Sequence, residues 1–150
     1  MPVEYHRAPL REIAPETLYR ILWLRVTVFV VEQEAAYPEL DGRDLEPDAE
    51  LLWAEDGAEV VATLRVLHDG DVARIGRVAT AASARGQGIA ARLMERGVAR
   101  CEERWPQHAI VLDAQQHLGP WYARFGFVIS GEPFSEDGIP HVPMRRPARA

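Results

Sequence analysis

The sequence contains no lysine and no asparagine, so all 17 of its basic side chains are arginines. The absence of lysine excludes a Schiff-base lysine and a phosphate-binding Walker lysine, and the absence of asparagine excludes an asparagine-linked glycan. A bias toward GC-rich codons explains both absences at least as well as selection on the protein. The single cysteine, Cys101, cannot form an intramolecular disulfide, and it excludes a zinc site built on paired cysteines.

Long hydrophobic runs are also missing. The longest apolar stretch, residues 21–31, is interrupted by Arg25 and is far shorter than the roughly 20 residues that span a bilayer. Residues 1–10 lack the apolar core of a signal peptide, so we expect a cytoplasmic protein with no membrane partner. The formal net charge of −6, from 17 basic and 23 acidic side chains, argues against a general nucleic-acid binder.

The residues that are present suffice for one domain. The chain has 150 residues, of which 47% are hydrophobic. A chain of this length buries about 68–70% of its unfolded surface on folding. No repeat, low-complexity tract or linker divides the sequence, so we expect residues 1–150 to form a single domain.

Hydrophobic periodicity predicts a mixed α/β, or α+β, fold with one sheet and helices packed on it. Pro15 suits the first turn of a helix, and apolar residues then recur at helical spacing to about Val31. Asp-Gly pairs separate the next three strands, as in an antiparallel meander. The predicted strands are 51–55, 60–68, 72–80, 109–113, 127–130 and 142–145, after a short first strand around residues 3–5, and the later helices are 89–104 and 118–124, the last ending at Gly126.

The segment between the third strand of the meander and the next helix, Arg85-Gly86-Gln87-Gly88-Ile89-Ala90, is the most informative. Its glycines permit close approach of a ligand to the backbone, and the following helix offers unpaired amides and the positive end of its dipole. Arg85 adds a guanidinium that can reach phosphate oxygens. These features predict a pyrophosphate site, although two glycines before a helix occur as often for structural reasons. The Walker A and dinucleotide-binding patterns are excluded by the missing lysine and third glycine.

The same segment carries a family resemblance. Arg85-x-x-Gly88-x-Ala90 resembles the Arg/Gln-x-x-Gly-x-Gly/Ala loop of the GNAT superfamily of N-acetyltransferases, which cradles the pyrophosphate of coenzyme A. Downstream, Tyr122-Ala123-Arg124-Phe125-Gly126-Phe127 is similar to the Tyr-x-x-x-Gly-Phe segment on which many of these enzymes carry their general acid. Residues 24–33 and 136–141 resemble the bacterial ElaA-like branch, so the resemblance covers nearly the whole chain.

The resemblance implies a fold and a reaction. The fold is a central, mostly antiparallel sheet of about six or seven strands flanked by about four helices. The reaction is direct attack by a primary amine of a small molecule, peptide or protein on acetyl-CoA in a ternary complex. The pantetheine would lie between residues 78–80 and 109–113, with the amide of Val78 or Ala79 facing the thioester carbonyl. The coenzyme residues would be Val78, Ala79, Thr80, Arg85, Gly86, Gln87, Gly88, Ile89 and Ala90.

Two catalytic residues follow from the same resemblance. The neutral phenol of Tyr122 can give a proton to the leaving thiolate. The acceptor, an alkyl ammonium with a pKa of about 10.4, needs a base before it can attack. The candidates are Glu32, Asp113, His141 or a water chain, and Glu32 is favoured because the resemblance places the end of the first helix beside the acceptor cleft.

Two other functions remain open on the sequence. One is a catalytically idle coenzyme A-binding regulatory module, and the other is an acyltransferase that uses another acyl donor. The oligomeric state is open as well, with a homodimer as the commonest soluble assembly.

Other polar residues receive plainer interpretations. Cys101 lies on an apolar helical stripe, which favours a buried side chain over a nucleophile. The five histidines show no i, i+4 pairing, so we expect no metal. The acidic residues of loop 41–48 lack an EF-hand pattern and predict a solvent-exposed face, or alternatively a surface that attracts a cationic acceptor. Arg124 either pairs with a coenzyme phosphate or caps its helix.

Overall fold

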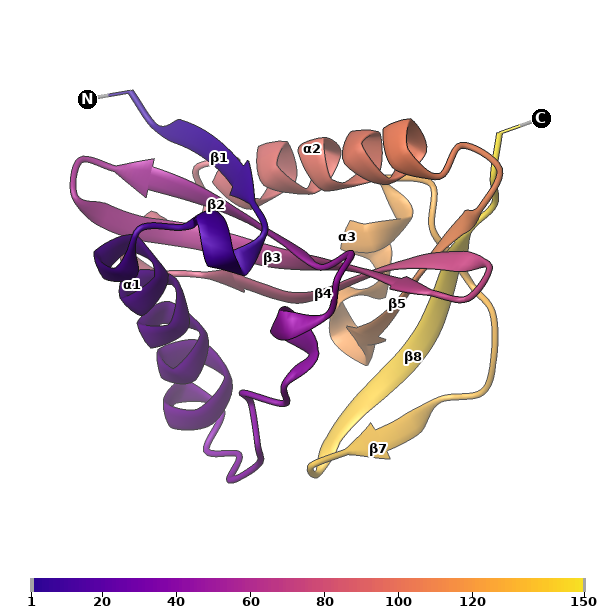
Figure 1. Ribbon diagram of the computed structural model, residues 1–150. Coiled ribbons are helices and arrows are strands. Elements are labelled where there is room, and N and C mark those ends of the chain that lie inside the picture. Colours follow the sequence, from indigo (N-terminus) through magenta and orange to yellow (C-terminus); the bar gives the residue numbers. More distant parts are fainter. Residues whose placement is uncertain (1, 150) are drawn as a thin grey trace.

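The computed structural model describes residues 2–149, which form one sheet with helices on both faces (Figure 1). The strand order is β1-β2-β3-β4-β5-β8-β6, with β7 paired to β8, and β4 and β5 are the one parallel pair. The strands are β1 (Glu4–Ala8), β2 (Glu50–Asp56), β3 (Glu59–Asp69), β4 (Val72–Thr80), β5 (Ala109–Gln115), β6 (Val128–Ile129), β7 (Phe134–Glu136) and β8 (Ile139–Arg146). The helices are α1 (Pro15–Val26), α2 (Ile89–Arg104) and α3 (Gly119–Ala123).

The mixed, mostly antiparallel fold predicted from the sequence is confirmed, but the numbers of elements differ. The described residues form eight strands rather than six or seven, and three α-helices rather than four. The additional strand, β7, is a three-residue exposed segment that lacks the alternation by which a strand is recognised. Between α1 and β2, residues 43–45 form only a short 3-10 turn.

Helix α1 begins at Pro15, as predicted, where the missing amide hydrogen costs nothing. Beyond Val26 the chain continues as a π-helical segment, Thr27–Glu32, so the helical region extends as far as expected but changes pitch. π-Helical turns are rare and are found mostly near functional sites. This one lies against β4 and directs Phe29 and Glu32 toward the end of that strand.

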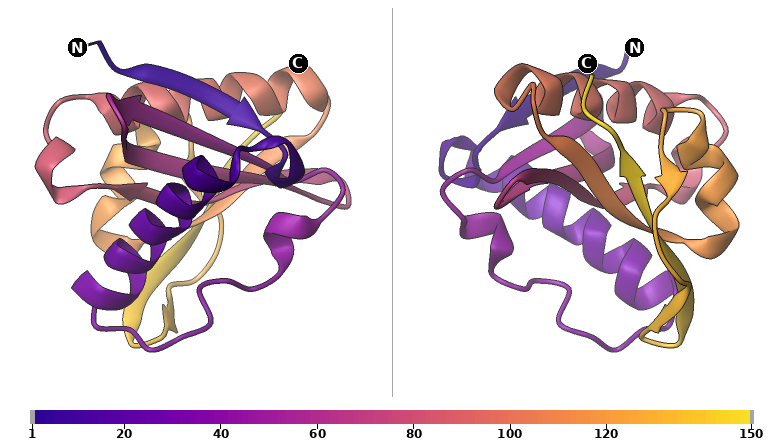
Figure 2. Two further views of the ribbon diagram at one scale, coloured as in Figure 1. Left: turned by 60° about the vertical axis from the view of Figure 1, so that its left-hand side comes forward. Right: turned by 90° about the vertical axis from the view of Figure 1, so that its right-hand side faces the viewer.

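The two faces of the sheet carry separate apolar clusters. Along β2, Leu52 and Ala54 belong to the cluster under α2 and α3, whereas Leu51 and Trp53 belong to the cluster under α1. Successive residues of a strand point to opposite faces, so one strand contributes to both clusters. Figure 2 shows α1 on one side of the sheet and α2 with α3 on the other. No helix among residues 2–149 is long and apolar enough to cross a membrane.

Cys101 lies in the cluster under α2, where it is 1% exposed. Burial raises the pKa of its thiol to about 12, from an ordinary value of 9.0. The unfolded chain therefore loses this proton first as the pH rises, and the free energy of unfolding falls between about pH 9 and pH 12. Urea denaturation over this range measures the effect. The free energy of unfolding of Cys101→Ala should fall less steeply than that of the unchanged protein, by on the order of 1 kcal/mol per pH unit. An identical decline in both proteins would contradict the buried, neutral thiol.

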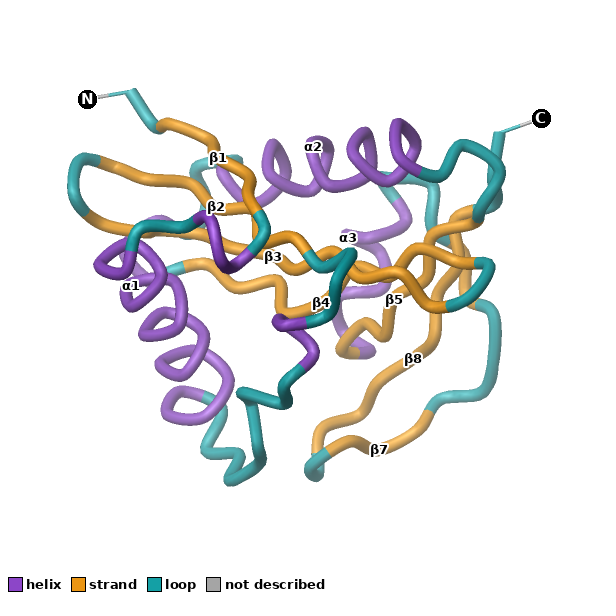
Figure 3. The backbone as a smooth tube through the Cα atoms, in the orientation of Figure 1, coloured by secondary structure: helices purple, strands orange, loops and turns teal. Residues whose placement is uncertain are grey.

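Strands β4 and β5 separate along their length. They pair only between Val72–Arg74 and Ala109–Val111, although β4 continues to Thr80 and β5 to Gln115. Strand β8 stays paired with β5 as far as Gln115 and diverges from β4 together with it (Figure 3). The sheet is therefore open between the second half of β4 and the end of β5.

Candidate active site

A cavity of about 750 Å³ lies beside the open end of β4. Its walls come from the π-helical segment, the end of β4, the glycine-rich loop, the start of α2 and α3. All the predicted coenzyme residues except Gln87 line it: Val78, Ala79, Thr80, Arg85, Gly86, Gly88, Ile89 and Ala90. Gln87 is directed elsewhere, and its side-chain amide donates to the backbone oxygen of Ser83 at 3.3 Å.

The glycine-rich loop presents free amides to this cavity. Gly86 and Gly88 have φ angles of 80° and 77°, a left-handed conformation that favours glycine. The first amide of α2 bonded within the helix is that of Arg92, which donates to the oxygen of Gly88 at 3.1 Å. The amides of residues 89–91 therefore have no acceptor within the helix, and no side chain of residue 88 caps them. This arrangement suits an anion such as a diphosphate.

Gly88→Ala tests this loop, with Gly57→Ala as its matched control. Both glycines have left-handed φ angles, 77° and 65°, but Gly57 lies in the turn between β2 and β3. Each substitution should cost about 1–2 kcal/mol of stability. Only Gly88→Ala adds a methyl group to the wall of the large cavity, so it alone should weaken coenzyme A binding, by about tenfold in calorimetry. Equal affinities for the two variants would contradict the assignment.

Glu32 also lines this cavity. Its Oε2 lies 2.7 Å from Nη2 of Arg85, whose Nε donates to the backbone oxygen of Thr80 at 3.1 Å. The pair fixes Arg85 at the wall of the cavity, with half of the arginine side chain exposed.

Tyr122 lies in α3, at the wall of the same cavity. It is 7% exposed and packs edge-to-face against Trp121, with ring centroids 4.9 Å apart. Burial raises the pKa of its phenol to about 12, so the group is neutral over the physiological range. The chain turns back after α3 at Gly126, whose φ of 92° confirms the predicted C-terminal glycine.

A second cavity, of about 380 Å³, meets the first one at Tyr122. It extends between β4 and β5 and is bordered by the loop before β2 and by the β7–β8 hairpin. More charged side chains of both signs line it than line the larger cavity, whose wall is more apolar. The residues that line both cavities are Phe29, Gln33, Val78, Gln115, Leu118 and Tyr122.

Strand β4 carries a bulge where the cavities meet. Gly76 is paired with Arg65 of β3 and Ala79 with Thr63, so Arg77 and Val78 are left without partners in the register. Arg77 has a φ of 52°, and its Nη2 donates to the backbone oxygen of Glu39 at 3.1 Å. Bulges of this kind redirect backbone groups near active sites. Val78, one of the two residues whose amide is expected to face the thioester, therefore lies at an irregularity of the sheet.

The acidic loop is only in part the solvent-exposed face that the sequence predicted, because Asp41 and Asp48 are exposed but Asp44 is not. Asp44 is buried, and its Oδ1 accepts from Nη1 of Arg25 at 2.7 Å, while Glu39 accepts from Nε of Arg25 at 2.6 Å. Burial alone would lower the pKa of Arg25, but its hydrogen bonds to Asp44 and Glu39 outweigh burial and raise it. Burial likewise opposes the ionisation of Asp41, yet a hydrogen bond from Arg65 contributes to a pKa of about 2. These three carboxylates therefore neutralise buried arginines, a role that the sequence did not predict.

Two of the other candidate bases line the smaller cavity. Asp113 lies 3.4 Å from Nη1 of Arg74, so its carboxylate is shared with an arginine. Nδ1 of His141 donates to the backbone oxygen of Ile139 at 2.8 Å, so in the neutral form of the ring Nε2 carries the lone pair. That nitrogen lies 3.7 Å from Glu136, too far for a direct hydrogen bond. Arg124, by contrast, lies at the C-terminal cap of α3 and lines the larger cavity.

Comparison with known proteins identifies the family. Residues 15–147 match the family model described as an acetyltransferase (GNAT) domain. The chain belongs to the GNAT family. Among its GNAT relatives, ElaA of Escherichia coli is 37% identical over 147 residues, which cover 96% of each chain. A UPF0039 protein of Mycobacterium tuberculosis is 47% identical over 143 residues, which cover 91% of this chain and 88% of the relative.

Solved GNAT structures agree with this assignment. An acyl-CoA N-acyltransferase from Pseudomonas aeruginosa superposes with a TM-score of 0.92 at 39% identity, covering 97% of this chain and 99% of that one. The crystal structure of Escherichia coli ElaA gives a TM-score of 0.92 at 36% identity with the same coverage. The resemblance to the GNAT superfamily and to its ElaA-like branch is therefore confirmed.

Proposed function

We propose that this GNAT protein transfers an acetyl group from acetyl-CoA to a primary amine in a ternary complex. The observation that supports this most is the meeting of two cavities at Tyr122 and Val78, in the opening between β4 and β5. The larger cavity contains free helix amides suited to a diphosphate, and the smaller one is polar. The donor and the acceptor would thus approach one another from opposite sides of Tyr122.

The reaction needs no covalent intermediate with the protein. The amine nitrogen attacks the thioester carbonyl, the oxyanion accepts a hydrogen bond from the amide of Val78, and the carbon–sulfur bond then breaks. Tyr122 hydrogen-bonds the departing sulfur and supplies its proton. Desolvation disfavours a thiolate as it disfavours a phenolate, so the same apolar wall that keeps Tyr122 protonated also raises the proton affinity of the leaving group.

The proton lost by the amine requires an acceptor in the smaller cavity. We assign this role to His141, one of the candidates from the sequence, because its Nε2 carries a free lone pair there. Glu32, which the resemblance favoured, would need to leave Arg85 and act across the junction of the cavities. We propose instead that Glu32 acts by positioning Arg85 for the coenzyme.

Matched variants distinguish the two roles. His141→Gln should lower kcat about tenfold and change the pH profile of kcat, since the group that accepts the proton is lost. Glu32→Gln should raise KM for acetyl-CoA with an unchanged pH profile, and Glu34→Gln, an exposed neighbour, should change neither. If Glu32→Gln altered the pH profile and His141→Gln did not, Glu32 and not His141 would be the base.

The proposed activity is tested by thiol release from acetyl-CoA with a panel of small amines, peptides and proteins. We expect turnover that depends on the amine, with an acetylated product detected by mass spectrometry. Saturable coenzyme binding in calorimetry without turnover on any amine would instead indicate an idle regulatory module. Turnover restricted to longer acyl-CoA donors would reassign the donor while keeping the chemistry.

A further inference from the structure

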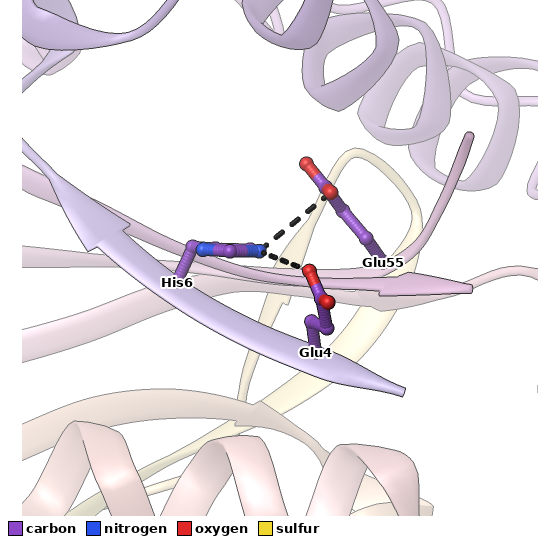
Figure 4. Close-up of side chains that lie close together, drawn as sticks. All are labelled: Glu4, His6 and Glu55. Atoms are coloured by element: carbon purple, nitrogen blue, oxygen red, sulfur yellow. Dashed lines mark ion pairs between the residues drawn. The ribbon is translucent and has the colours of Figure 1, made fainter. Parts of the chain in front are cut away.

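Three ligand-type side chains meet at the edge of the sheet, outside the cavities described above. Glu4 and His6 lie on the same face of β1, two residues apart, and Glu55 is the direct cross-strand partner of Glu4 on β2. Figure 4 shows the distal nitrogen of the His6 ring directed between the two carboxylates. Helical i, i+4 spacing could not reveal this group, because the register of two strands brings it together.

The distances between these groups are compatible with a metal ion bound between them. Nε2 of His6 lies 3.4 Å from Oε2 of Glu4 and 3.6 Å from Oε2 of Glu55. Ligands about 2.0–2.1 Å from a tetrahedral ion are separated by roughly 3.3–3.4 Å, close to these two values. One oxygen or nitrogen from each of the three residues lies within 4.8 Å of the others.

Nε2 of His6, which lies between the two carboxylates, has no hydrogen-bond partner among the described residues. Nε2 of His6 has almost no solvent-exposed surface, and within residues 2–149 it makes no hydrogen bond. A buried polar atom without a partner normally costs free energy. The two carboxylates that face it also lie opposite one another across an antiparallel pair, an arrangement that destabilises a sheet unless a cation lies between them.

Trp53 holds two of the three groups in place. Its indole stacks on the His6 ring, with centroids 5.4 Å apart, and its Nε1 donates to Oε1 of Glu55 at 2.9 Å. The second oxygen of Glu55 is thereby left free on the side of His6. Contacts of this kind, which orient ligands from behind, are characteristic of metal sites.

We propose that Glu4, His6 and Glu55 bind one divalent transition-metal ion of the zinc class. One nitrogen and two oxygens suit Zn²⁺, and the divalent charge balances the two carboxylates. The exposed side of Glu4, with 69% of its side chain accessible, leaves a fourth position for water. Strands β2 and β3 separate β1 from β4, so the ion acts on the fold and not on the reaction. The ion stabilises the pairing of β1, the edge strand, with β2 at its first residue, Glu4.

The test uses untagged protein freed of metal by a chelator, with Zn²⁺ as the probe. Calorimetry should show one equivalent bound with micromolar affinity. The thermal midpoint should rise by about 5–10 °C when free Zn²⁺ is about 100 times the dissociation constant. Co²⁺ should give the intense visible absorption of a tetrahedral site. Hydrogen exchange of the β1 amides should slow when Zn²⁺ is added.

Variants assign the binding to these residues. His6→Gln and Glu4→Gln should each abolish the calorimetric and thermal responses, and Glu4→Gln changes an exposed side chain that folding does not need. His108→Gln is the control, because His108 forms a close histidine pair with His68 elsewhere in the fold, with nitrogens 3.2 Å apart. Binding that survives in both site variants, or is lost in His108→Gln, would overturn the proposal.

A protonated His6 is the competing explanation for the same geometry. A simple ion pair between an imidazolium and two carboxylates would leave the thermal midpoint unaffected by Zn²⁺. That result would also overturn the metal site. Neither outcome depends on acetyl transfer, so the proposal and the enzymatic activity fail or succeed separately.

Discussion

Replacing Tyr122 with phenylalanine is expected to lower kcat for acetyl transfer about 100-fold, the lower end of the range for a general acid. The substitution removes only the hydroxyl group. The ring keeps its packing against Trp121, and the larger cavity keeps its shape, so the affinity for coenzyme A should not change. Steady-state kinetics combined with calorimetry on the same protein measures both quantities.

Tyr19→Phe provides the control for Tyr122→Phe. Tyr19 is exposed on α1 and lines neither cavity, so its hydroxyl should be dispensable. If Tyr122→Phe retained full turnover, the phenol would have no part in departure of the thiol. If it lost turnover and coenzyme affinity together, Tyr122 would act as a wall of the binding site and not as a proton donor.

Arg25→Ala is expected to lower the free energy of unfolding by about 3–5 kcal/mol, because two buried carboxylates lose the arginine that is hydrogen-bonded to both and keep only longer contacts to Arg65 and Arg77. Arg25 is 1% exposed and is hydrogen-bonded to both Glu39 and Asp44. Urea denaturation at pH 7 measures the loss. Arg20→Ala, one turn earlier, removes only an exposed pair with Glu16 at 3.9 Å and should cost less than about 1 kcal/mol.

A rescue experiment identifies the cause of the loss in Arg25→Ala. Adding Glu39→Gln and Asp44→Asn removes the two buried charges that have lost Arg25, so the triple variant should regain a large part of the lost stability. No recovery would mean that the cavity left by the arginine, and not the buried charge, is responsible. The backbone oxygen of Glu39 also accepts a hydrogen bond from Arg77, beside the bulge of β4. Arg25→Ala alone should therefore impair acetyl transfer as well.

The sequence predicted the parts of the fold that depend on neighbouring residues. Asp56–Gly57 and Asp69–Gly70 marked the turns between β2, β3 and β4, and β4 has the predicted bounds. The glycine-rich loop could be recognised because left-handed positions and free helix amides have a direct signature in residue type. The short β7 could not, since three exposed residues carry no periodicity.

Features that depend on contacts across the fold were missed. Arg25 occupies a core-facing position of α1, between the buried Leu24 and Val28, and a buried arginine needs acidic partners. The position of Arg25 therefore predicted acidic partners but could not identify them. Glu39 and Asp44 come close to Arg25 only because of the path that their loop takes. In the same way, the proximity of His6 to Glu55 follows from the register of β1 on β2, which sequence spacing does not reveal.

The most direct test of the proposed coenzyme site is a crystal structure of the protein with coenzyme A. We predict that the diphosphate contacts the backbone amides of the loop from Arg85 to Ala90, that the pantetheine lies in the opening between β4 and β5, and that its sulfur reaches Tyr122. A nucleotide bound elsewhere on the molecule, or an opening filled by side chains with the thiol outside it, would contradict the account.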